Sequence, residues 1–214
     1  MEADEAADKI REAKEEKEEQ RSESWFRTQA SIAIAVLAML LAIASLGRED
    51  ATKETINSNI LASDTWAFYQ AKNIRQTDYQ LASDELNTML LLNTETLSAD
   101  TQKNIRNILD RYKATIERFE SEPDLKEPNN PLAGTGKKEL QQQAQAWEEK
   151  RNHAQERVPN FDYSAAIFQI AIVLGSVSIV ANSRRILGLA LVAGVIAFLL
   201  MMNGFFLFMR LPIG

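Results

Sequence analysis

Residues 28–46 read TQASIAIAVLAMLLAIASL, an uninterrupted apolar run that sets the architecture expected of this chain. Two more apolar runs follow after a long polar region, SAAIFQIAIVLGSVSIVA at 164–181 and ILGLALVAGVIAFLLMMNGFFLFM at 186–209. Each approaches or exceeds the roughly 20 residues that a helix needs to cross a ~30 Å hydrocarbon layer. The sequence therefore predicts an all-α protein with three transmembrane helices, a single span followed later by a C-terminal hairpin.

Composition and motifs exclude several classes of function for this chain. The chain has 214 residues, a net charge of −6 and no cysteine, which excludes disulfides, thiolate metal sites and cysteine nucleophiles. No segment is strongly basic, so we expect no nucleic-acid partner. His153 is the sole histidine and has no second ligand near it, while AGTGKK at 133–138 lacks the glycine spacing of a phosphate loop. We expect neither an enzyme nor a cofactor or metal site.

Residues 1–27 form a polar arm of acidic and basic side chains that leads into the first apolar run. The segment Ala42-Ile43-Ala44 matches a signal-peptide cleavage pattern, but the long acidic arm and the length of the run favour a retained anchor. Lys and Arg gather in the arm and in the 182–185 turn, which favours a cytoplasmic N-terminus. The region 47–163 would then lie on the extracytoplasmic side.

The region 47–163 is predicted to be a helical extramembrane domain. An apolar row recurs every seven residues at Ile60, Ala67, Ile74 and Leu81. The companion row begins with Ile56 but continues through polar residues. This weak heptad is typical of coiled-coil packing, either inside a small bundle or in an oligomeric stalk.

Capping and breaking residues divide the rest of this domain. Ser98 is the expected N-cap of an amphipathic helix that extends to Phe119. The segment 122–136 is rich in Pro and Gly and predicts a loop that turns the chain. We expect the next helix to end at Pro159, and Asp162 to cap the second apolar run.

Small residues recur on one face of each apolar run, and in lipid such stripes let helix backbones approach closely. The candidate packing residues are Ser31, Ala35, Ala38 and Ala42 in the first run, Ala171 and Gly175 in the second, and Ala190 and Gly194 in the third. Two interpretations stay open, packing within one chain and a homo-oligomeric seam. Gln169 and Asn203 are the strongly polar residues well inside the runs, and they are the residues expected to matter if several copies formed a channel.

Three segments together resemble a known family. They are WAFYQAKNIRQ at 66–76, NFDY at 160–163 and an apolar hairpin turned by Arg184-Arg185. Over roughly residues 25–210 the chain is similar to a bacterial membrane-protein family catalogued as a domain of unknown function and numbered four-three-three-seven. The resemblance implies a multi-pass protein of the bacterial inner membrane with this three-span layout, and it supplies no activity or cofactor.

The first of these segments offers candidate interaction residues. They are Trp66, Tyr69, Gln70, Lys72 and Arg75. One hypothesis is a recognition surface for a partner or a lipid headgroup; the other is an ordinary helix seam with amphipathic edges.

The function expected from the sequence is that of a non-enzymatic assembly or scaffold component in the lipid bilayer. It would form homo-oligomers, bind another envelope protein, or both. An envelope sensor that acts through residues 1–27 and an oligomeric channel are the alternatives.

Overall fold

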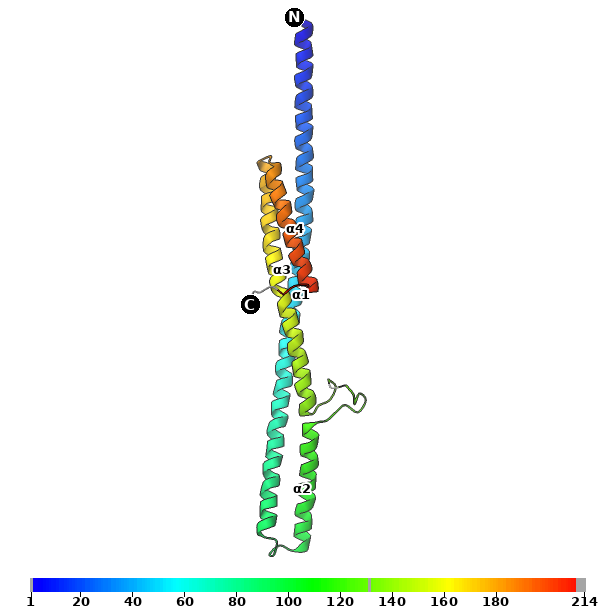
Figure 1. Cartoon of the computed structure of the whole chain (residues 1–214), viewed down its shortest axis with the longest axis vertical. Helices are drawn as coiled ribbons and strands as arrows, with labels where there is room; N and C mark the ends of the chain where they lie inside the picture. Colours follow the sequence, from blue (N-terminus) through cyan, green and yellow to red (C-terminus); the bar gives the residue numbers. More distant parts are fainter. Residues whose placement is uncertain (1, 131, 211–214) are drawn as a thin grey trace. The chain divides into compact units, whose positions relative to one another are not determined.

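The computed structural model describes residues 2–130 and 132–210, with most side chains from Arg11 onward. Over these residues it contains four helices and no strand (Figure 1). They are α1 (Glu2–Leu92), α2 (Ala99–Glu120), α3 (Lys137–Val180) and α4 (Arg184–Phe206). The predicted all-α class is confirmed, and α1, α3 and α4 are long and apolar enough to cross a membrane.

Helix α1 joins three regions that the sequence treats separately. It carries the described part of the polar arm, the first apolar run and the beginning of the polar region without interruption; Met1 of the arm lies outside the described residues. Between Glu2 and Leu92 the chain has no Pro, and Gly47 is the one Gly. An isolated Gly costs a helix about 1 kcal/mol relative to Ala, too little to end it.

Helix α3 corrects one expectation. It continues through Pro159, so the prediction that a helix ends there and that Asp162 caps a new one is wrong. An interior Pro removes one backbone hydrogen bond and costs about 3 kcal/mol. The two residues that follow it, Asn160 and Phe161, are completely buried, and this packing holds the helix together. Asp162 instead forms an ion pair with Arg48 of α1 at 2.5 Å.

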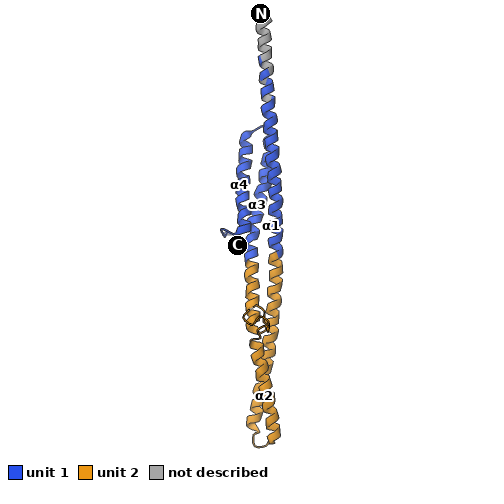
Figure 2. Ribbon diagram, turned by 90° about the vertical axis from the view of Figure 1, so that its right-hand side faces the viewer, with its two compact units in different colours: residues 1–53, 153–214 blue, residues 54–152 orange. Residues whose placement is uncertain are grey.

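The chain divides into two compact units (Figure 2). Unit 1 comprises residues 1–53 and 153–214, and unit 2 comprises residues 54–152. In unit 1 the apolar parts of α1, α3 and α4 pack around Phe161 and Phe168, both fully buried. Smaller side chains such as Ala44 and Ala197 surround the two rings.

Unit 2 consists of the second half of α1 with α2 and the beginning of α3, which run antiparallel to it (Figure 1). Ser98 is the N-cap of α2 as predicted, and its hydroxyl accepts a hydrogen bond from the Thr101 backbone N–H at 3.2 Å. Tyr79 of α1 contacts the rings of Tyr112 and Phe119 of α2. Because α1 is covered on one side only, the core of unit 2 is thin.

The segment that links α2 to α3 is a loop, as its Pro and Gly residues predict; Pro131 within it lies outside the described residues. The Asp124 carboxylate accepts hydrogen bonds from the backbone N–H groups of Lys126 and Glu127. The Gln143 side chain donates to the Gly134 carbonyl oxygen at 2.6 Å. The Asp124 contacts shape the loop itself, and the Gln143 contact fixes it on the start of α3.

Candidate functional site

The polar residues of unit 1 point inward and bind one another. Asn203 of α4 donates through Nδ2 to the Asn160 Oδ1 atom of α3 at 2.7 Å and to the Met209 carbonyl at 2.8 Å. Its Oδ1 atom accepts from the Met209 N–H at 2.9 Å. Asn203, which the sequence offers as a channel residue, thus ties α3 to α4 and holds the turn that follows α4. Its hydrogen-bonding groups are engaged within the chain.

A second inward contact joins α3 to α4 one turn further along. The Ser164 hydroxyl donates to the Ala197 carbonyl at 2.9 Å, and Ser164 is fully buried. Nearer the end of α4, the Arg157 guanidinium donates to the Gly204 carbonyl at 3.1 Å. Sequence reasoning missed Asn160 and Ser164. Their spacing in the sequence could have revealed them, because residues four apart lie on the same face of a helix.

Two glycines leave room for the ring of Phe161. A Cβ atom built on Gly47 of α1 would lie 2.6 Å from Phe161 Cε1, and one on Gly204 of α4 would lie 2.9 Å from it. Real Cβ atoms do not approach other carbons this closely. The ring is therefore held between the backbones of two neighbouring helices, and glycine is required on both sides of it.

The three small-residue stripes differ in burial. Those of α3 and α4 face the interior: Ala171, Gly175, Ala190 and Gly194 are buried. A Cβ on Gly175 would lie 2.8 Å from Ile34 Cγ1, and one on Gly194 would lie 2.5 Å from Leu37 Cδ2. The stripe of α1 is exposed over its whole length, at Ser31, Ala35, Ala38 and Ala42.

Another face of α1 makes the contacts inside unit 1. Ala30, Leu37 and Ala44 are buried there, each seven residues from the next. The packing of α1 against α3 and α4 thus uses a row that the sequence analysis did not single out. The small-residue stripe of α1 lies outside this buried row and is exposed.

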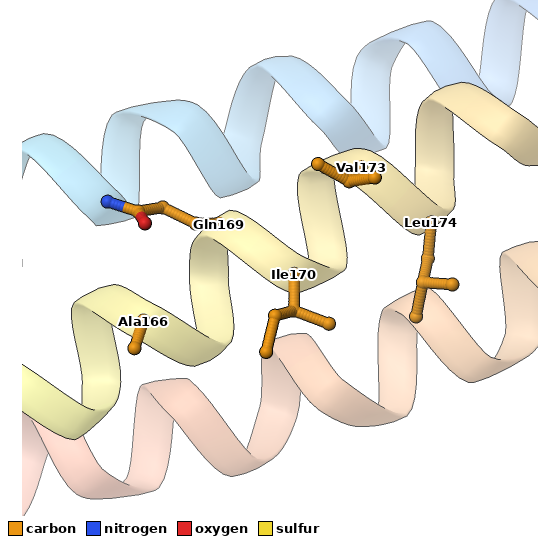
Figure 3. Close-up of a pocket in the computed structure, with 5 residues that line it drawn as sticks. All are labelled: Ala166, Gln169, Ile170, Val173 and Leu174. Atoms are coloured by element: carbon orange, nitrogen blue, oxygen red, sulfur yellow. The ribbon is translucent and has the colours of Figure 1, made fainter.

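Gln169 lies on the exposed side of α3. It lines a shallow pocket whose other residues also come from α3, Ala166, Ile170, Val173 and Leu174 (Figure 3). Because one helix supplies the whole lining, this pocket is a surface hollow and not a passage between helices. Gln169 and Asn203 are not brought together, since Asn203 is buried.

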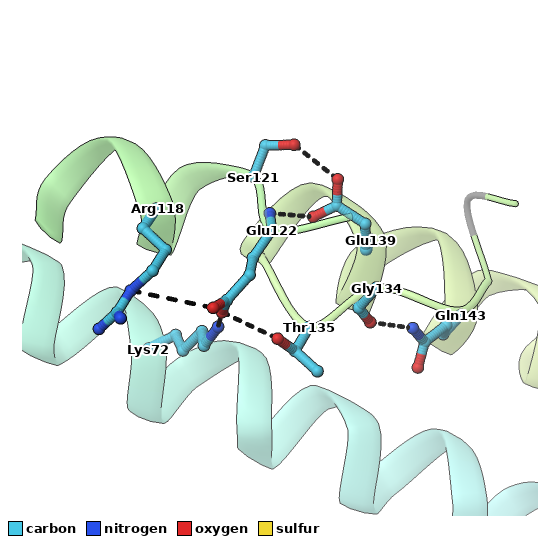
Figure 4. Close-up of polar contacts among 8 residues, drawn as sticks. All are labelled: Lys72, Arg118, Ser121, Glu122, Gly134, Thr135, Glu139 and Gln143. Atoms are coloured by element: carbon cyan, nitrogen blue, oxygen red, sulfur yellow. Dashed lines mark hydrogen bonds and ion pairs between the residues drawn. The ribbon is translucent and has the colours of Figure 1, made fainter. Parts of the chain in front are cut away.

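In unit 2, carboxylates fasten the loop to the helices (Figure 4). Glu122 accepts from Lys72 Nζ of α1 at 2.8 Å and from the Thr135 hydroxyl at 2.9 Å, and these two bonds lower the pKa of its carboxyl. Glu139 accepts from the Ser121 hydroxyl at 2.6 Å and from the Glu122 N–H at 3.1 Å. Burial acts to raise the pKa of Glu139, but these bonds outweigh it and the pKa is lowered.

The aromatic and cationic residues of the 66–76 segment are used mainly within unit 2. Trp66 Nε1 donates to Glu148 Oε1 of α3 at 2.9 Å, and Tyr69 meets the Trp66 ring edge-on with centroids 5.5 Å apart. Lys72 binds Glu122, as described above. Gln70 and Arg75 are exposed. The structure brings Trp66, Tyr69 and Lys72 to one seam and leaves Gln70 and Arg75 outside it.

A model of a known protein family matches most of the chain. The family model described as Domain of unknown function (DUF4337) matches residues 26–207. This chain belongs to the DUF4337 family. The resemblance inferred from the sequence is thereby confirmed. No curated protein and no solved structure matches the chain.

The DUF4337 match coincides with the packed part of the protein. It begins at Phe26, the first buried residue among the described side chains of α1, and ends at Leu207, the left-handed C-cap of α4. Among the described residues of this DUF4337 protein, no group of three or more His, Asp or Glu side chains is placed to hold a metal ion.

Proposed function

We propose that this DUF4337 protein is an integral membrane protein of the bacterial inner membrane that serves as a non-enzymatic assembly component. In this proposal α1, α3 and α4 cross the bilayer through their apolar parts. Residues 1–27 lie in the cytoplasm and unit 2 lies outside it. Arg184 and Arg185, in the turn between α3 and α4, support this orientation because Lys and Arg gather on the cytoplasmic side.

The observation that carries the membrane assignment is the inverted polarity of unit 1. Its outward side chains are large and apolar, among them Ile170, Val173, Leu189, Val192 and Leu199. Its polar side chains Asn160, Ser164 and Asn203 are buried and hydrogen-bonded. In water such an apolar exterior is unfavourable, whereas in lipid an apolar exterior costs nothing and buried polar groups need internal partners.

The assembly role is supported by the exposed stripe of α1. Within a bilayer the hydrophobic effect does not drive helices together, so close backbone contact between small residues is a main source of association. The small-residue stripes of α3 and α4 are buried inside the chain, whereas the small-residue stripe of α1 is exposed. We propose that it contacts an apolar helix of a neighbouring subunit.

Two measurements test this function. Alkaline extraction of membranes should leave the full chain in the pellet, and release into the supernatant would refute membrane integration. Light scattering in mild detergent should give a mass above one chain. The double variant Ala35→Leu/Ala42→Leu should weaken association by about tenfold, which corresponds to ~1.4 kcal/mol. The matched control is Val36→Leu, an exposed apolar position off the stripe; equal loss in both variants would remove the stripe from the proposal.

A further inference from the structure

Helix α1 exposes an apolar row in unit 2. The row consists of Ile60, Ala67, Ile74 and Leu81, which the sequence analysis could assign either to a bundle interior or to an oligomeric stalk. Ile60, Ile74 and Leu81 remain 52%, 61% and 57% exposed. The opposite face of α1 holds the buried residues Ser58, Ala62 and Gln76, and Gln76 donates a hydrogen bond to the Ile116 carbonyl of α2 at 3.1 Å. The row therefore lies on the outer surface of unit 2.

The spacing of the row corresponds to the a positions of a heptad repeat. The d positions are then Ile56, Ser63, Gln70 and Thr77. Ile60 and Ile74 are β-branched residues at a positions, as in two-stranded parallel coiled coils, although those carry Leu at d. Three of the four d positions here are polar, which lowers the stability of the seam but helps to specify its register. The row is thus suited to a parallel, two-stranded contact in which each residue meets its own counterpart.

The flanks of the row distinguish between orientations. The e positions carry Asp64, Ala71, Asp78 and Glu85, and the g positions carry Asn59, Trp66, Asn73 and Gln80. In a parallel pair each g residue meets an e residue of the other strand, so every acid faces an amide. In an antiparallel pair e positions meet e positions, and carboxylates would face carboxylates.

Two of these amides are already oriented by α3. The Oδ1 atom of Asn59 accepts from Arg151 at 3.2 Å, and the Oδ1 atom of Asn73 accepts from Lys137 Nζ at 3.0 Å. With its oxygen turned toward a cation, each amide presents its nitrogen as the donor. A carboxylate at the facing e position is the complementary acceptor.

We propose that the exposed row of α1 binds the same row of a second copy of this chain, in a parallel coiled coil. The proposal rests on the proposed function, because anchoring both copies in one membrane makes the helices parallel and sets them at equal height. The contact from Ile56 to Leu81 is about 39 Å long and about 10 Å wide. It covers roughly 400 Å² per copy, about half of a standard interface. Confinement to the membrane raises the effective concentration and compensates for this small area.

Cross-linking tests the contact directly, since the chain contains no cysteine. The variant Ile74→Cys is placed in the full chain, in native membranes, under mild oxidation. Facing a positions bring the two sulfurs within disulfide range. The control is Arg75→Cys, also exposed and about 100° around the helix. We expect at least about tenfold more covalent dimer from Ile74→Cys; equal yields, or none, would overturn the proposal.

A second measurement separates this inference from the proposed function. In a Leu81→Cys background, Ile74→Asp should reduce the yield of covalent dimer about tenfold, because two carboxylates would meet in the seam. Ile74 is exposed, so the substitution leaves the core of unit 2 intact. If the native chain is oligomeric in detergent but neither cysteine cross-links, the row is not the contact and the assembly function stands. If the native chain is monomeric, both are wrong.

Discussion

The effect of Gly47→Ala on stability should depend on whether the Phe161 ring is present. With the ring in place the added methyl group should destabilise the protein, and without the ring it should stabilise it. In Gly47→Ala the new Cβ would lie 2.6 Å from Phe161 Cε1 and 2.7 Å from Cζ. The ring cannot retreat freely, because Gly204 backs it on the other side. Overpacking of this kind costs about 1–3 kcal/mol. Replacing Gly by Ala inside a helix stabilises the helix by about 1 kcal/mol, which offsets part of this cost.

The net expectation is a loss of about 0–2 kcal/mol in the native background. With Phe161→Ala in place the clash disappears, and Gly47→Ala should stabilise the protein by about 1 kcal/mol. The coupling between the two sites is therefore about 1–3 kcal/mol, within the range measured for residues in contact.

Thermal unfolding of the full chain in mild detergent, followed by circular dichroism, measures this cycle. For a chain of this size 1 kcal/mol corresponds to about 2–4 °C in Tm. Gly188→Ala is the matched control, because a Cβ there meets nothing within 4 Å. It should raise Tm in both backgrounds. If Gly47→Ala changes Tm equally with and without Phe161, the ring does not occupy the space that we assign to it.

Three further changes have defined outcomes. Asn203→Leu removes two donated hydrogen bonds and one accepted from the Met209 N–H, and it takes away the donor that Asn203 supplies to the buried Asn160 Oδ1 atom. It should therefore lower stability by about 1–3 kcal/mol in the same thermal assay. The lowered pKa of Glu139 means that its contribution to stability is present above the ordinary carboxyl pKa of 4.5 and is lost as pH falls through its folded value. Glu139→Gln should therefore be less stable than the native chain at pH 7 and converge with it in acid, and parallel pH curves would refute this role. Ser98→Ala removes the N-cap bond of α2 and should cost about 1 kcal/mol, seen as faster hydrogen exchange in the first turn of α2.

Local signals in the sequence predicted much of the fold. The apolar runs, the Ser98 cap and the Pro- and Gly-rich loop each act over a few residues, and each is found where expected. Pro159 is the exception. Its local preference is to break a helix, but the burial of Asn160 and Phe161 depends on residues far along the chain, and this tertiary packing prevails.

The candidate site was harder to predict, because α1 carries small residues on more than one face. Ala30 and Ala44 pack inside unit 1, whereas Ala35 and Ala42 do not. Periodicity alone gives both sets equal weight, and only the neighbouring helices distinguish them. Likewise the hydrogen bond from Trp66 to Glu148 could not be predicted from local sequence, because the two residues lie 82 positions apart.

The central claim is that this DUF4337 protein associates in the membrane through α1. Counting copies by single-molecule photobleaching, in discs of native membrane that hold the labelled full chain, tests it most directly. The account predicts two bleaching steps per disc, and predominantly one step in Ile74→Asp combined with Ala35→Leu and Ala42→Leu. Single steps from the native chain would contradict it.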